Sequence, residues 1–173
     1  MSRQPASQAI ALMGRAPARW LLVDVAAQTV SLMRGEAVAA TWPVSTAAAG
    51  VDARDGSGGT PPGWHVIARR IGHGADPGAV FVSREPTGEI WNGDDDPRDL
   101  ILGRILTLDG RQDGVNRGPG VDSLARYIYL HGTNHEDRIG RPCSHGCVRL
   151  RRADMVALFD LVEEGDAVVI VGG

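Results

Sequence analysis

The side chains best suited to chemistry are concentrated in residues 131–150, which read HGTNHEDRIGRPCSHGCVRL. This stretch holds three of the five histidines, His131, His135 and His145, and both cysteines, Cys143 and Cys147. Imidazole and thiol groups at such short spacing can bind a metal, and two thiols can form a disulfide. A thiol beside an imidazole can also act as a nucleophile. The stretch therefore offers three kinds of chemistry.

A zinc site is the first alternative, because His131 and His135 have the spacing H-x3-H while Cys143 and Cys147 have the spacing C-x3-C. These spacings fall within the range of Cys2His2 sites. Against zinc, only seven residues separate the two pairs, and a structural site has no need of Gly146 before Cys147. A disulfide between the cysteines would close a very small loop with little entropic benefit. Both alternatives stay open but are disfavoured.

The nucleophile interpretation requires an activated thiol, a nearby imidazole, a group that orients the imidazole, and backbone N–H donors for an oxyanion. Cys147 follows Gly146, which lets the backbone turn sharply and bring successive N–H groups toward one point. A nearby imidazolium would lower the pKa of the thiol. We therefore expect a resting thiolate at Cys147.

The motif HGT at 131–133, followed by SHGCVRL at 144–150, resembles the signature of the YkuD-type L,D-transpeptidase family. The segments WLLVDVAAQTVSLMRG, WPVSTA, GGTPPGWHVI and ALFDLVEEGDAVVIV also resemble the family's order of elements, from Trp20 onward. The resemblance implies a mixed β-sandwich or barrel with a cleft over the cysteine loop. It also implies that Cys147 is the nucleophile and His131 the general base, oriented by the Gly132 carbonyl.

The resemblance implies roles for further residues of the same stretch. The N–H groups of Gly146 and Cys147 would donate to the oxyanion, and His145 would line the site. Arg149 would bind the polar end of the substrate, since a guanidinium suits a carboxylate. Ser144 would hydrogen-bond within the loop beside the substrate. No metal and no cofactor is implied, and Cys143 and His135 are left without a catalytic role.

The implied reaction is acyl transfer on peptidoglycan stem peptides or muropeptides. The cysteine attacks the bond between the L-centre of a diamino acid and D-alanine, D-alanine leaves, and a thioester remains. Water would then give L,D-carboxypeptidase activity, whereas an amine would give 3-3 cross-links or exchange of D-amino acids. Carbapenem-type β-lactams are the covalent inhibitors expected from the resemblance. An alternative of another class is a non-catalytic, zinc-stabilised peptidoglycan-binding module.

Composition and the lengths of the apolar runs indicate which partners and which cellular location to expect. The net charge of -3, and the lack of a basic stripe with interleaved aromatic residues, argue against nucleic acid as a partner. The first 20 residues contain no apolar run long enough for an export signal, and no run of the chain is long enough to span a membrane. We therefore expect a cytoplasmic protein, or a periplasmic one if the sequence is a trimmed piece. A cytoplasmic location favours the carboxypeptidase, because cross-linking requires polymerised wall.

Short strand patterns separated by glycine and proline predict a mainly β fold with few helices, in one domain. We expect residues 1–18 to form an N-terminal extension and residues 19–173 the catalytic domain. The helix is expected within 151–165, where Met155, Leu158, Phe159 and Val162 have helical spacing. Strands are expected at 20–25, 29–35, 37–45, 64–72, 79–86, 89–93, 99–110, 125–132 and 166–171.

Overall fold

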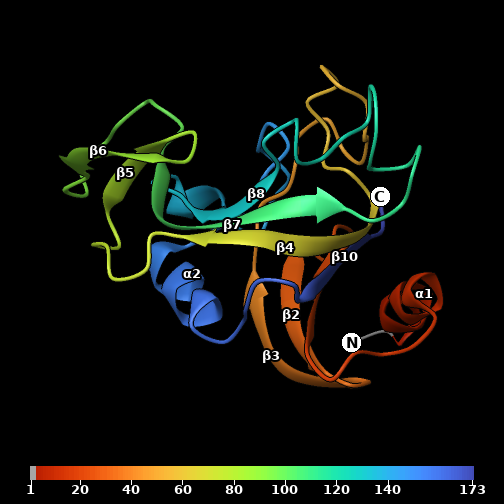
Figure 1. Cartoon of the computed structure of the whole chain (residues 1–173). Helices are drawn as coiled ribbons and strands as arrows, with labels where there is room; N and C mark the ends of the chain where they lie inside the picture. The colour runs from red at the N-terminus through yellow and green to blue at the C-terminus, as the bar shows by residue number, and fades with distance from the viewer. Residues whose placement is uncertain (1–2) are drawn as a thin grey trace.

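The computed structural model describes residues 3–173, and these form one mixed, ten-stranded sheet with two α-helices (Figure 1). The helices are α1 (Gln4–Met13) and α2 (Arg152–Phe159), with a short 3-10 turn at Glu136–Arg138. The strands are β1 (Trp20–Asp24), β2 (Thr29–Arg34), β3 (Ala37–Pro43), β4 (Gly63–Ile71), β5 (Ala79–Val82), β6 (Glu85–Ile90), β7 (Ile101–Gly110), β8 (Tyr129–Gly132), β9 (Val148–Leu150) and β10 (Ala167–Val171). The predicted mainly β class is confirmed.

The strands follow one another in the order β3-β2-β1-β10-β4-β7-β5-β6, and β8 pairs with both β7 and β9. The pairs β1/β10 and β8/β9 are parallel, and the others are antiparallel. Strands β4 and β7 cross the middle of Figure 1, with α2 on one side of them. The segments before β4 and after β7 lie on the other side, together with the loop that precedes β9.

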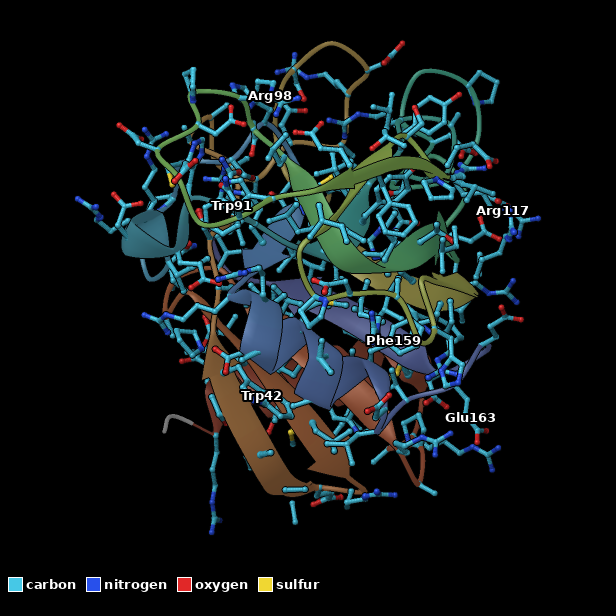
Figure 2. All side chains as sticks on the ribbon, turned by 90° about the vertical axis from the view of Figure 1, so that its left-hand side faces the viewer. Trp42, Trp91, Arg98, Arg117, Phe159 and Glu163 are labelled. Carbon is cyan, nitrogen blue, oxygen red and sulfur yellow. The ribbon has the colours of Figure 1, made fainter. Side chains whose placement is uncertain are left out.

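Strands β1 and β10 are buried along their whole length because α1 covers one face of this part of the sheet and the main core covers the other. Leu21 and Val23 of β1 face the main core, which Met155 and Phe159 of α2 complete. The alternate side chain Leu22 instead faces a second cluster, in which Ala9 of α1 is fully buried. Figure 2 labels Phe159 on α2 and Trp42 on β3, which both belong to the main core. The expected N-terminal extension thus contains a helix that packs on the sheet.

Several predicted elements differ from the observed ones in their bounds. The helix ends at Phe159, so Val162 is buried in the core from the following turn and not from the helix. The predicted strand 125–132 begins only at Tyr129, because Tyr127 has a φ of 57°, which interrupts extended backbone. Strand β9 was not predicted. No helix of the described residues is long and apolar enough to cross a membrane.

Candidate active site

Parallel pairing of β8 with β9 brings the two halves of the motif together. His131 lies opposite Arg149 in the register, and Cys147 immediately precedes β9. The side chains surround a cavity of about 150 Å³. Its lining consists of Asp99, Ile101, His131, Ser144, His145, Cys147 and Arg149.

The His131 side chain is oriented by its own neighbour in the chain. His131 is 3% exposed, and its Nδ1 lies 2.7 Å from the Gly132 carbonyl oxygen. Because a carbonyl only accepts, Nδ1 carries the proton and Nε2 has the lone pair. Burial lowers the pKa of His131, although the Gly132 carbonyl and the Asp99 charge oppose this shift. His131 is therefore neutral at pH 7 and able to accept a proton at Nε2.

The Cys147 thiol packs beside Tyr129, Phe81 and Ile105 and lies within reach of two backbone groups. Its Sγ lies 3.4 Å from the Tyr127 carbonyl oxygen, to which it donates, and accepts from the Tyr129 N–H at 3.4 Å. Burial raises the pKa of the Cys147 thiol from 9.0 to about 11, against the opposing Tyr129 N–H and the charges of Arg149 and Arg126. The expectation of a resting thiolate is therefore wrong, because desolvation outweighs these groups. The resting pair is a neutral thiol and a neutral imidazole.

The loop that carries the thiol is fixed by hydroxyl groups. Gly146 has a φ of 134°, which favours glycine, and its carbonyl accepts from the buried Thr60 hydroxyl at 2.9 Å. The Ser144 hydroxyl donates to the Cys147 carbonyl at 2.6 Å and accepts from the Gly146 N–H at 3.3 Å. Ser144 thus acts within the loop as expected from the sequence, and the long bond to Gly146 engages one of the two expected oxyanion donors. The oxyanion role of Gly146 and Cys147 stays a prediction.

Arg149 lines the cavity but is 2% exposed, and its guanidinium already has partners. It donates to Asp99 at 2.9 Å and to the Cys143 sulfur at 2.9 Å. His145 is the opposite case, with 87% of its side chain exposed and its Nδ1 3.3 Å from the other Asp99 oxygen. Contact of Arg149 with a substrate carboxylate stays a prediction, and the more accessible basic side chain of the cavity is His145.

The residues of the zinc alternative do not come together. Cys143 contacts Arg149 and the Ser45 hydroxyl, while His135 lies 3.2 Å from the Asp96 carbonyl through its Nε2. Within residues 3–173, no three His, Cys, Asp or Glu side chains are grouped so that they could hold a metal. Both cysteines are free thiols. The geometry supports the nucleophile interpretation over the metal one.

Three residues outside the motif shape this site and were not identified from the sequence. Asp99 pairs with Arg149, and Thr60 holds the Gly146 carbonyl. Arg126 donates to the Gly59 carbonyl at 2.9 Å and so holds the residue next to Thr60, whose hydroxyl bonds to Gly146. All three lie outside the observed strands, between 5 and 71 residues before His131 along the chain. Their position beside the motif depends on tertiary contacts and could not be predicted from local sequence patterns.

The comparisons with known proteins agree with this geometry. The family model of the YkuD L,D-transpeptidase catalytic domain matches residues 18–170. The putative L,D-transpeptidase YkuD of Bacillus licheniformis is 34% identical over 82 residues, which are 41% of this chain and 50% of that protein. Its Bacillus subtilis counterpart is 31% identical over 91 residues, which are 52% of this chain and 47% of that protein. The chain thus matches about half the length of these curated relatives.

Solved structures share the fold at low sequence identity. An L,D-transpeptidase from Mycobacterium smegmatis has a TM-score of 0.52 at 20% identity, covering 90% of this chain and 59% of that one. One from Xylanimonas cellulosilytica has a TM-score of 0.53 at 18% identity, covering 96% and 70%. L,D-transpeptidase 3 from Mycobacterium tuberculosis, in complex with a faropenem-derived adduct, has a TM-score of 0.56 at 16% identity, covering 90% and 61%. With the family model spanning nearly its whole length, this chain belongs to the YkuD L,D-transpeptidase catalytic domain family.

Proposed function

We propose that the protein transfers the acyl group of peptidoglycan tetrapeptide stems through a thioester on Cys147, with release of terminal D-alanine. The observation that carries this proposal is the pairing of groups around one cavity. The Cys147 thiol and His131 line the same space of about 150 Å³, and the Gly132 carbonyl leaves Nε2 of His131 as the base.

The first half of the proposed reaction forms the thioester and releases D-alanine. Cys147 Sγ attacks the carbonyl carbon of the diamino acid while its proton passes to Nε2 of His131. When the tetrahedral intermediate collapses, the C–N bond breaks and the D-alanine amine takes that proton. Because thiol and imidazole are both neutral at rest, the ion pair forms only as attack proceeds. Backbone N–H groups at Gly146 and Cys147 would stabilise the developing oxyanion.

We propose water as the acceptor, which makes the activity that of an L,D-carboxypeptidase. The small volume of about 150 Å³ beside the thiol suits a small leaving group or a water molecule more readily than a second stem. The favoured cytoplasmic location stays a prediction, which fractionation of cells that produce the protein would test.

Transpeptidation is the second candidate, because the curated relatives bear the name L,D-transpeptidase. A second cavity of about 320 Å³ adjoins the first through Asp99 and Ile101, and this space could admit an amine acceptor.

Mass spectrometry of products distinguishes the two acceptors. Purified protein is given a disaccharide tetrapeptide with and without an excess of a D-amino acid. Tripeptide and free D-alanine in both samples indicate hydrolysis, whereas an exchanged tetrapeptide or a cross-linked dimer indicates transfer. Release of D-alanine must stop in Cys147→Ala. Equal release by Cys147→Ala, or none by the unaltered protein, would refute the proposal.

A further inference from the structure

Asp99 is the acidic side chain in the lining of the catalytic cavity, and it comes from the segment that leads into β7. One oxygen accepts from Nη1 of Arg149 at 2.9 Å, and the other lies 3.3 Å from Nδ1 of His145. About a third of the Asp99 side chain, 34%, is exposed. It therefore links the buried Arg149 to the exposed His145.

Arg149 depends on this carboxylate for its charge balance. The guanidinium is 2% exposed, its Nε has no hydrogen-bond partner, and its other contacts are the Cys143 sulfur and the Ser45 hydroxyl. Among the residues that the structure describes, Asp99 is the one acidic group in ion-pair contact with Arg149. A buried cation requires such a counter-ion. Arg149 is thus held as part of the cavity wall, with its charge already compensated.

His145 is directed by the same carboxylate. Since a carboxylate only accepts, Nδ1 of His145 donates to Asp99, and Nε2 is the ring nitrogen that this contact leaves available to a ligand. With 87% of its side chain exposed, His145 can meet a ligand without displacing any protein contact. When the ring is protonated, Nε2–H donates a charge-assisted hydrogen bond to an anionic group.

We propose that Asp99 is a positioning residue, which fixes the buried Arg149 with one oxygen and directs the exposed His145 toward the substrate carboxylate with the other. This inference rests on the proposed function, since the carboxylate is that of the terminal D-alanine. It assigns recognition of that group to His145, and it gives Arg149 the task of setting the charge around the thiol. In Asp99→Asn the Arg149 charge is uncompensated, and the thiol ionises more easily.

The first measurement requires no substrate. The rate of alkylation of Cys147 by iodoacetamide is followed against pH in a Cys143→Ser background. The charged or titratable side chains around Cys147 are His131, His145, Tyr129, Arg126, Arg149 and Asp99. Asp99→Asn should move the profile to lower pH by about half a unit or more, because a negative charge is lost. The control Asp95→Asn, at an exposed site of the same loop, should leave it unchanged. Superimposable profiles for the two variants would refute the proposal.

The second measurement separates binding from chemistry. A tetrapeptide stem with a free D-alanine carboxylate is compared with the same peptide ending in an amide. Asp99→Asn and His145→Gln should each raise KM for the acid peptide about tenfold, as expected for loss of one charge-assisted contact. The increase in KM should be smaller for the amide in both variants, because the amide has no carboxylate for His145 to bind. Equal effects on the two peptides would overturn the assignment to His145. His145→Gln keeps the Asp99–Arg149 pair, so it tests the proposal even if Asp99→Asn does not fold.

The two measurements also separate this inference from the proposed function. If the unaltered protein releases no D-alanine but Asp99→Asn still shifts the alkylation profile, the proposed function fails and the link from Asp99 to the thiol stands. If D-alanine is released and both Asp99→Asn readouts match Asp95→Asn, the positioning role alone is refuted.

Discussion

The Thr60 hydroxyl links the segment at Ala47 to the loop that contains Cys147, and its removal should destabilise the protein strongly. Thr60 is fully buried. Its hydroxyl donates to the Gly146 carbonyl at 2.9 Å and accepts from the Ala47 N–H at 3.0 Å. Valine has nearly the same shape, so Thr60→Val leaves both backbone groups without a partner and creates no cavity. At about 1 to 3 kcal/mol for each unsatisfied buried group, the two groups together predict a loss of about 2 to 6 kcal/mol of unfolding free energy.

Urea denaturation at pH 7 measures this loss, and another threonine provides a matched control. The Thr29 hydroxyl is buried without a hydrogen-bond partner, so Thr29→Val should be neutral or stabilising by up to about 1 kcal/mol. Thr60→Ser keeps both hydrogen bonds and should lose about 1 kcal/mol for its missing methyl group. D-alanine release should fall in Thr60→Val even where the protein stays folded, because the loop beside Cys147 relaxes. Equal stability of the two valine variants would refute the reasoning.

Four further outcomes are expected. Alkylation of Cys147 should rise about tenfold per pH unit toward its pKa of about 11, so a midpoint near pH 8 would contradict the neutral pair. D-alanine release should decline in acid, because His131 becomes protonated there. Since the pKa of His131 is lowered, this decline should occur below the ordinary pKa of histidine, and release should not decline from pH 7 to 9. A carbapenem should add one adduct by intact mass, lost in Cys147→Ser but kept in Cys143→Ser. Burial lowers the pKa of His65 from 6.5 to about 4, so the folded state binds fewer protons than the unfolded chain in this window. The unfolding free energy should therefore fall by about 3 kcal/mol as pH drops through it, and His65→Gln should lack this part of the loss in urea titrations.

Strands with a strong local pattern were predicted well from the sequence. Strands β1, β2 and β10 are short apolar runs bounded by turns, and each was expected close to its observed bounds. Strand β9 was missed because three residues within a polar loop carry no detectable period, and it forms only through pairing with β8. Tyr127 has the composition of a strand residue, yet its φ of 57° turns its carbonyl toward the Cys147 sulfur. The backbone conformation at such positions depends on tertiary contacts.

The site likewise has some properties that depend on the motif itself and others that depend on residues distant in the sequence. Roles could be predicted for His131, Gly132, Ser144 and Cys147 because the expected base, its orienting carbonyl and the thiol all lie within the motif. The ionisation of that thiol could not be predicted, because it depends on the packing of β7 and β8 around it.

The charge within the cavity depends on a distant residue. Asp99 is 50 residues from Arg149 along the chain and compensates its charge in the cavity wall. A family member with a neutral residue in place of Asp99 would have the same motif but an uncompensated guanidinium beside the thiol. In the proposed mechanism, the motif supplies the atoms that react, whereas Asp99 in the loop before β7 governs how easily the thiol ionises and directs His145 toward the substrate.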